Sequence, residues 1–196
     1  SRSQTKTSVP RTSNTYEMPD TFVSLSRNLD AELYVRSVHA YDAYLSGRAD
    51  IRYDFKRNRV VFLVKDGNKV VDAVGRSIDG RSPKWYRYGN SKCPFVSGSG
   101  ERGACVVEDA ASACSISSHI AGVAVLGTNL LDEHIDYLTK YPRVFVALDK
   151  DATDKAVDMV KTLCKVVPTK LMVLPRDLKN MTKDERDDFL RNRIDR

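Results

Sequence analysis

The sequence lacks several features that would assign it to a common protein class. Its four cysteines, Cys93, Cys105, Cys114 and Cys164, include no C-x-x-C pair, which argues against a disulfide framework or a zinc site and is typical of core residues in a reducing compartment. No apolar run approaches the length of a membrane span, and no signal peptide opens the chain. The G-x-x-x-x-G-K-[ST] motif of P-loop motors is also missing. We therefore expect a soluble, cytoplasmic protein without a motor of this type.

The composition is that of an ordinary globular protein, but the charge is unevenly spread. The chain has 196 residues, enough for one large domain or two small ones, with 41% apolar and 30% charged residues. Residues 1–103 hold 18 Lys and Arg against 11 Asp and Glu, a net charge of +7, whereas residues 104–196 carry a net charge of −1. A basic half next to an acidic half suits a protein that brings a polyanion to a metal site.

A buried strand followed by two acids organises the second half. The apolar run Val144–Leu148 is typical of a strand buried on both faces, as in a parallel sheet. It ends in Asp149 and Asp151, at the position where open α/β sheets bind their ligands. Two nearby anions repel each other, so a divalent metal such as Mg²⁺ is one interpretation of this pair. The other is a solvated helix N-terminus, where Asp is favourable anyway.

A second junction between a strand and a helix repeats the pattern, because the apolar run 104–107 ends in Glu108 and Asp109. Strands are expected near 104–108, 123–126, 144–148 and 170–174, alternating with helices near 110–120, 131–140, 152–165 and 183–193. This alternation predicts βαβ units and a parallel sheet. Asp177 follows the last of these strands, so we expect all the acids at one edge of one sheet.

The start of the chain is less regular. Residues 1–20 are polar and rich in Ser and Thr, which is typical of a flexible lead-in or linker. From Phe22 to Ala49, apolar residues recur at loosely helical spacing. This spacing predicts a helix that Asp20-Thr21 caps and that Gly47 ends.

A hairpin and a basic, aromatic stretch follow. Two strand-like runs within 59–75 flank Asp66-Gly67, which predicts a β-hairpin because the turn needs positive φ angles. In SPKWYRY, residues 82–88, cations and rings interleave, so the stretch can contact nucleic acid through phosphates and bases. It can equally be a β-ribbon with one solvated and one packed face. The segment SGSGERG, 97–103, predicts a flexible joint.

The two acid-bearing junctions resemble the TOPRIM domain, which primases, topoisomerases and some nucleases share. That family carries a Glu after its first strand and Asp-x-Asp after a later one, and Glu108, Asp149 and Asp151 match these positions. The family usually has Gly after the Glu, whereas this chain has Asp109, to which the sequence assigns no role.

The hairpin resembles a more specific pattern, found in replicative primases of the bacterial type. These carry an apolar strand, an Asp-x-x-Gly-type turn, Gly-Arg and Pro-Lys-Tyr just before the TOPRIM domain. The segments VVFLVKDGNKVVDAVGR and SPKWY fit this pattern, with Arg76 and Lys84 at basic positions of the family. A Lys that the family often has after Pro-Lys-Tyr is missing, and Lys92 and Arg102 are the two candidates to replace it. Further matches to the family are AYLSGRA at 43–49, Leu126-Gly127-Thr128, and Asp177.

The resemblance implies an α/β fold, with a TOPRIM domain of the parallel-sheet βαβ type preceded by a small basic α+β subdomain that contains the hairpin. Within this fold we expect a lead-in at 1–20, the subdomain at 21–98 and the TOPRIM catalytic domain at 99–196. The implied function is that of a DNA primase catalytic core, similar to the primase part of phage primase–helicases. Such a nucleotidyltransferase makes short RNA primers on single-stranded DNA from ribonucleoside triphosphates, with Mg²⁺ or Mn²⁺.

The resemblance also implies roles for individual residues. Asp149 and Asp151 would be the principal metal ligands with Asp177 assisting, and Glu108 would be a further ligand or a general base. Nucleotide or nucleic-acid contacts would come from Arg76, Lys84, Trp85, Tyr86 and Arg87. The zinc ribbon that primases of this type usually carry has no counterpart among the Cys and His residues, so the partners would be a zinc-binding module or a replicative helicase.

Two other functions remain open at this point. The acids by themselves suit phosphodiester cleavage as well as synthesis, so one alternative is a metal-dependent nuclease or RNA-processing enzyme of the TOPRIM type. The second is a non-catalytic nucleic-acid-binding module that kept the fold. The hairpin and the Pro-Lys-Trp-Tyr stretch favour synthesis over cleavage.

Overall fold

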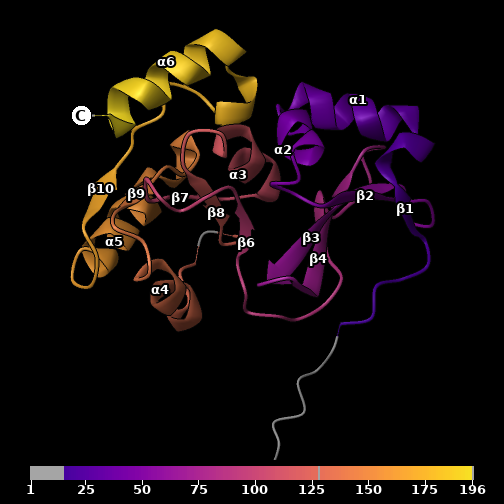
Figure 1. The fold of residues 1–196 in the computed structure, drawn as a ribbon, viewed down its shortest axis with the longest axis horizontal. Coiled ribbons are helices and arrows are strands. Elements are labelled where there is room, and N and C mark those ends of the chain that lie inside the picture. The colour runs from indigo at the N-terminus through magenta and orange to yellow at the C-terminus, as the bar shows by residue number, and fades with distance from the viewer. Residues whose placement is uncertain (1–15, 128, 196) are drawn as a thin grey trace, which may run out of the picture.

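The computed structural model describes residues 16–127 and 129–195, which form two five-stranded sheets with helices packed on them (Figure 1). The first sheet is antiparallel and the second contains parallel strands, so the chain is a mixed α/β protein as expected. Most of the expected lead-in at 1–20 lies outside the described residues. No helix in the described ranges combines the length and the apolar character that crossing a bilayer requires.

The first sheet is built around the predicted hairpin. Its strands follow the order of the chain: β1 (Phe22–Ser24), β2 (Ile51–Asp54), β3 (Arg59–Asp66), β4 (Lys69–Ser77) and β5 (Trp85–Arg87). The hairpin between β3 and β4 is confirmed, and Gly67 adopts a φ of +63° in its turn, where a side chain would be strained. The basic, aromatic stretch adds β5 to the sheet, antiparallel to β4.

The prediction of a single helix from Phe22 to Ala49 is wrong. Phe22–Ser24 is β1, and after the short 3₁₀ turn Leu25–Arg27 the chain forms two helices, α1 (Leu29–Ser37) and α2 (Tyr41–Leu45). Asn28, not Asp20 or Thr21, caps α1, because its side-chain oxygen accepts a hydrogen bond from the Ala31 N–H at 2.9 Å. His39 has a φ of +61°, a left-handed conformation that ends one helix before the next begins.

The second sheet has the parallel strands that the alternating pattern predicted. Its order is β10 (Thr169–Leu171), β9 (Val144–Val146), β7 (Ala104–Val107), β8 (Ala121–Ala124) and β6 (Phe95–Ser97). The first four are mutually parallel, and β6 pairs antiparallel with β8 at one edge. Strand β6 therefore belongs to the second sheet although it ends at Ser97, the first residue of the expected joint at 97–103. The division into domains at 98/99 stays a prediction.

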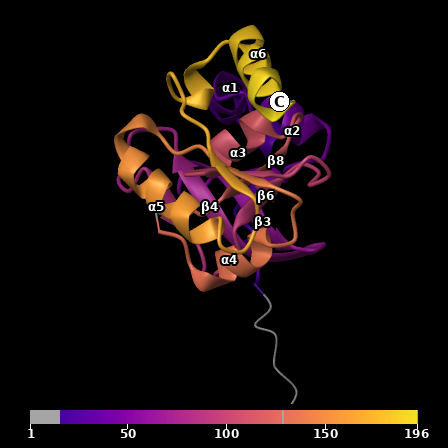
Figure 2. The ribbon, with the colours of Figure 1, turned by 90° about the vertical axis from the view of Figure 1, so that its left-hand side faces the viewer.

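Helices cover both faces of the second sheet (Figure 2). Helices α4 (Asp132–Leu138) and α5 (Thr153–Leu163) pack on one face, and α3 (Ala110–Ile116) and α6 (Lys183–Ile194) lie on the other. Helix α3 lies so close to β8 that a Cβ at Gly122 would stand 2.2 Å from the Ala113 carbonyl oxygen. The core on the α3 side continues beneath α1 and α2 into the first sheet, so the two sheets share one apolar core.

Candidate active site

Glu108 and Asp109 follow the central strand β7, as expected, but they have different environments. Asp109 is buried and caps α3, since its Oδ1 accepts a hydrogen bond from the Ser112 N–H at 2.9 Å. Its Oδ2 accepts another from the Lys179 ammonium group at 3.1 Å. Asp109 is thus a helix cap with a cationic partner, which gives a structural role to the residue that departs from the TOPRIM pattern.

The carboxyl groups of Glu108 and Asp149 meet at the edge of the sheet. Strands β7 and β9 are neighbours and pair in parallel, so the residues that follow them emerge side by side. Burial, together with the negative charge and the hydrogen bond of Asp149, raises the pKa of Glu108 to about 7. Burial and the charge of Asp177 raise the pKa of Asp149 as well. The pair is therefore poised to share a proton, or to accept a cation in its place.

A lysine that the sequence analysis missed lies beside these acids. Lys179 is in the 3₁₀ turn Leu178–Asn180, directly after Asp177, and its ammonium group is largely buried against Asp109. The positive charge of Lys179 acts against the charge of Asp177, but the pKa of Asp149 remains raised overall. The signal available in the sequence was its position two residues after Asp177, an acid expected to follow the last strand, although β10 itself ends at Leu171.

Asp151 lies at the rim and not in the pair. It is exposed in the 3₁₀ turn Lys150–Ala152, and it borders a shallow depression of about 280 Å³ together with Glu108 and Asp149. In the part of the chain that the structure describes, no three His, Cys, Asp or Glu side chains converge as a ready metal-binding group. The donor set nevertheless suits a hard cation, because clustered carboxylates with raised pKa values lose their repulsion when a cation binds.

The acid pair forms one wall of a cavity of about 360 Å³ between the two sheets. Glu108, Asp109, Asp149 and Lys179 line it from the second sheet, with Leu126 and Gly127 from the loop after β8. The opposite wall is Val74 from β4, Lys84 just before β5, and Trp85–Arg87, which is β5 itself. Thr128, the third residue of the Leu-Gly-Thr match, lies outside the described residues.

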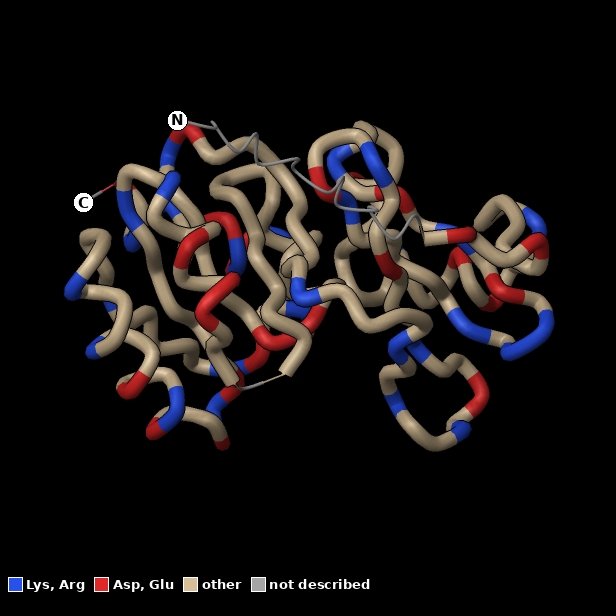
Figure 3. Tube along the Cα trace, turned by 90° about the horizontal axis from the view of Figure 1, so that it is seen from below, with Lys and Arg blue, Asp and Glu red and all other residues tan. Residues whose placement is uncertain are grey.

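Figure 3 shows acidic segments close together within the half that holds the second sheet, and basic residues along the loops of the other half.

Lys84, Trp85 and Tyr86 are three of the five residues predicted to contact nucleotide or nucleic acid. Lys84 is exposed, and it takes part in no ion pair within the described ranges. The Trp85 ring packs against the buried Phe62 ring at 5.7 Å between centroids, and Arg57 stacks on Tyr86 at 4.3 Å. The two rings therefore have packing partners in addition to their faces toward the cavity.

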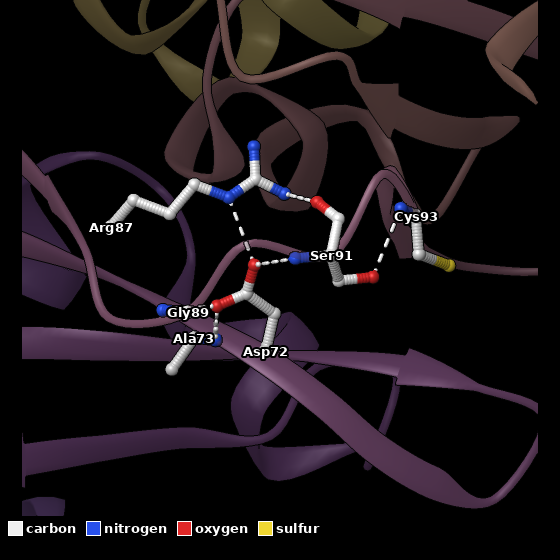
Figure 4. A network of polar contacts seen from close by, with 6 residues as sticks. All are labelled: Asp72, Ala73, Arg87, Gly89, Ser91 and Cys93. Carbon is white, nitrogen blue, oxygen red and sulfur yellow. Dashed lines mark hydrogen bonds and ion pairs between the residues drawn. The ribbon is translucent and has the colours of Figure 1, made fainter. Parts of the chain in front are cut away.

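Arg87 also lines the cavity, but a buried carboxylate holds it (Figure 4). Its Nε donates to Asp72 Oδ2 at 2.9 Å, and its Nη2 donates to the Ser91 carbonyl. Asp72 is fully buried in β4 and also accepts the backbone N–H groups of Gly89 and Ser91. Arg87 thereby fixes the loop that follows β5, whatever else it contacts.

Arg76, the fifth of these residues, is not among the residues that line the cavity. Its guanidinium carbon lies 5.8 Å from the centre of the Tyr34 ring and 5.9 Å from that of Trp85. Lys92 and Arg102 do not line the cavity either, since Lys92 pairs with Glu133 and Arg102 with Asp195 on the surface. Among the basic residues outside 84–87, the cavity wall instead includes Lys179.

No family model and no curated protein matches the sequence. Solved structures do match the fold. The catalytic core of Escherichia coli primase is 18% identical with a TM-score of 0.60, over 89% of this chain and 65% of that one. A DNA primase domain from Pseudomonas aeruginosa is 18% identical with a TM-score of 0.58, over 89% and 63%. A DnaG primase catalytic domain bound to single-stranded DNA is 18% identical with a TM-score of 0.57, over 86% and 60%.

The likeness establishes the fold, which is that of the catalytic core of bacterial replicative primases. The chain spans less than two thirds of the length of these structures. The mixed α/β fold with parallel strands, which the alternating pattern predicted, is confirmed.

Proposed function

We propose that this chain is a DNA primase catalytic core, a nucleotidyltransferase with a TOPRIM domain that makes short RNA primers on single-stranded DNA. The observation that supports this most is the composition of one cavity. Its acid wall, Glu108 and Asp149, faces Lys84, Trp85 and Tyr86 across the gap between the two sheets. A site of this kind has groups for phosphates, for bases and for a metal within one space.

The reaction joins two nucleotides. The 3′-hydroxyl group of one nucleotide gives up its proton, to Glu108 if that residue is the general base and otherwise to solvent, and its oxygen forms a bond to the α-phosphorus of the next nucleotide. The bond from that phosphorus to the bridging oxygen breaks, and pyrophosphate leaves. Lys84 and Lys179, from opposite walls, neutralise phosphate charge and hold the triphosphate in line for attack. The rings of Trp85 and Tyr86 orient a base, because stacking tolerates any of the four bases.

A divalent cation belongs to this proposal. Asp149 and Asp151 would be its principal ligands, with Asp177 assisting and Glu108 as a further ligand or general base. When bound by these residues, Mg²⁺ or Mn²⁺ would supply charge neutralisation at the transferred phosphate and would lower the pKa of the attacking hydroxyl group. Arg76 is proposed to act indirectly. Its guanidinium group lies near the rings of both Tyr34 and Trp85, and it would hold the Trp85 ring in position.

The proposal extends to partners and location. The substrates are a single-stranded DNA template and ribonucleoside triphosphates, in the cytoplasm. Phosphate contacts position a template without specifying its sequence, so start-site choice requires a partner such as a zinc-binding module or a replicative helicase. Residues 21–98 would act as the basic subdomain and 99–196 as the catalytic domain.

A priming assay tests this function. The chain is incubated with single-stranded templates of varied sequence, labelled ribonucleotides and Mg²⁺, and the products are resolved by length. New RNA that depends on template and metal is the expected result. Asp158→Asn is the matched control for site variants, since Asp158 is exposed on α5 and lines none of the cavities described above.

The same assay distinguishes the alternatives. Shortened template without new RNA would indicate a nuclease, and intact template without new RNA would indicate a binding module. Either result, obtained with protein that binds single-stranded DNA, would contradict the proposal.

A further inference from the structure

A second cavity, of about 220 Å³, lies where the helices of the two halves meet. Helices α1 and α2 form one side of it and α6 the other, and we name it the α1–α6 pocket. It shares no lining residue with the cavity of the candidate active site. The residues that line it are Arg36, His39, Tyr41, Asp42, Lys183 and Arg186.

Arg186 is the unusual residue of this pocket. It is only 7% exposed, and its Nε and Nη1 atoms are buried without a hydrogen-bond partner. It forms no ion pair within the residues described. A guanidinium group normally finds an acceptor when it leaves water, because a buried charge without one is costly. This group is therefore held ready for an acceptor that the protein itself does not supply.

The surroundings of Arg186 favour an anion. Lys183 and Arg36 add positive charge to the lining, and Asp42 is its one acid among the described residues. Asp187, the next residue along α6, has its Oδ1 2.8 Å from His119 Nε2. Its charge and that of Asp42 act on Arg186 without forming a hydrogen bond or ion pair with it among the described residues. Arg36 is 3.6 Å from both the Glu32 carboxylate and the centre of the Tyr41 ring, which fixes its side chain at the edge of the pocket.

We propose that the α1–α6 pocket binds a phosphate group. Phosphate oxygens match the fork of guanidinium N–H groups, and Arg and Lys together are the side chains that recognise them. One water molecule takes up about 30 Å³ in the liquid, so the pocket has space for a group of several heavy atoms. A bound phosphate would join α6 to α1 and α2, and would thereby tie the end of the chain to its first helices.

The pocket is linked to the candidate active site by a short stretch of chain. Lys179 lines the active-site cavity, the Met181 backbone hydrogen-bonds His39, and Lys183 lines the pocket. The inference does not depend on the proposed function, because the unpaired guanidinium is independent of any reaction. Two sources carry the same chemistry, a nucleic-acid backbone and a nucleotide polyphosphate.

The first test measures phosphate binding to the metal-free full chain in EDTA. Inorganic phosphate and pyrophosphate are titrated at constant ionic strength, followed by calorimetry and thermal unfolding. Wild type should gain about 3–5 °C in Tm at roughly tenfold excess over Kd. Arg186→Met should lose that gain while its phosphate-free Tm stays equal or rises, because an unpaired buried charge is replaced by an apolar side chain. Arg191→Met, at an exposed position of the same helix, is the control that keeps the gain.

A structural role for Arg186 predicts different results. If its guanidinium pairs with Asp42 in solution, both Arg186→Met and Asp42→Asn lower the Tm and phosphate has no effect on wild type, and this outcome overturns the proposal. The proposal instead expects Asp42→Asn to bind phosphate about threefold more tightly. Should Arg186→Met not fold, the double variant Arg36→Ala, Lys183→Ala serves, and an unchanged phosphate affinity there also overturns the proposal.

The second test separates the two sources. A single-stranded oligonucleotide without terminal phosphates and a nucleoside triphosphate are each titrated into wild type and Arg186→Met in EDTA. A loss of about tenfold for the oligonucleotide assigns the pocket to the nucleic-acid backbone, and the same loss for the triphosphate assigns it to nucleotides. No loss for either probe would refute the proposal. A failure of the priming assay leaves these binding results unaffected, so the two proposals can fail separately.

Discussion

Two sets of carboxylates in this molecule have opposite environments. Asp72, in the first sheet, is fully buried and accepts hydrogen bonds from Arg87 and from backbone N–H groups, so its charge is neutralised and its oxygens are satisfied. Glu108 and Asp149, in the second sheet, are half-buried against each other. Burial and the charge of Asp149 raise the pKa of Glu108, and burial and the charge of Asp177 raise the pKa of Asp149. The same chemical group is stabilised in one place and destabilised in the other.

This difference in environment distinguishes a carboxylate that stabilises the fold from carboxylates that a ligand or a reaction requires. A carboxylate with complete partners contributes to folding, and its loss should leave the loop after β5 without its anchor. Carboxylates placed next to one another cost folding energy, which a protein retains where a ligand or a reaction needs them. The comparison predicts that variants of Asp72 lower stability, whereas variants of Glu108 and Asp149 lower activity without lowering stability.

The largest effect is expected at Asp149. Under the proposed function, Asp149→Asn should reduce primer synthesis by roughly a thousandfold or more, because the proposed metal ligand would act directly on the charge of the transition state. Its Tm in EDTA should stay equal or rise, since one of two repelling anions is gone. Priming assays and thermal unfolding measure both, with Asp158→Asn as the control. Full activity at ordinary Mg²⁺ concentrations would reject the metal assignment.

The converse variant is Asp72→Ala. It should lower the free energy of unfolding by about 3 kcal/mol, because Arg87 and the backbone N–H groups of the loop lose their buried acceptor. Chemical denaturation measures the change. Asp136→Ala, at an exposed site on α4, should change the same quantity by less than about 0.5 kcal/mol. If Asp72→Ala were as stable as wild type but had little activity, the assignment of a structural role to Asp72 would be wrong.

A smaller effect is expected on the basic wall of the cavity. Lys84→Ala should weaken binding of single-stranded DNA or nucleotide by about tenfold and reduce the salt dependence by about one counterion, since one phosphate contact is lost. Fluorescence of Trp85, the only tryptophan, reports binding from the neighbouring position. Lys69→Ala, exposed at the far end of β4, is the matched control. If Lys84→Ala and Lys69→Ala bind with the same affinity and the same salt dependence, Lys84 does not contact the ligand and the basic wall of the cavity has only a structural role.

The smallest effect concerns pH. The pKa of Glu108 is about 7 in the folded chain against an ordinary value of 4.5, so the stability from its protonated form is present below pH 4.5 and is lost as the pH rises through 7. Glu108→Gln, which does not titrate, should therefore gain about 2 °C in Tm over wild type between pH 5 and pH 8 in EDTA. Unfolding curves across this range check it. A difference that stays constant with pH would mean that neither burial nor Asp149 raises the pKa of Glu108.

Local patterns in the sequence determined much of the fold. Uniform apolar runs ending in acids predicted β7 and β9 with Glu108 and Asp149 at their ends, and Asp66-Gly67 predicted the hairpin. These predictions succeed because the period of side chains along a strand, and the φ angles of a turn, depend on neighbours in the sequence. The same reasoning failed at Phe22–Ala49, where His39 breaks the helix and Phe22–Ser24 pairs with β2, a contact that no local pattern encodes.

Only the tertiary structure decided which side chains share a space. The order of the strands makes β7 and β9 neighbours, so Glu108 and Asp149 touch, while the packing of the two sheets brings β5 opposite them. Asp109 has its cationic partner in Lys179, 70 residues away in sequence, and Arg186 is buried without a hydrogen-bond partner only because α6 packs near α1 and α2. Sequence spacing says nothing about such pairs, because the charge and burial of each group depend on chain segments that fold against it from elsewhere.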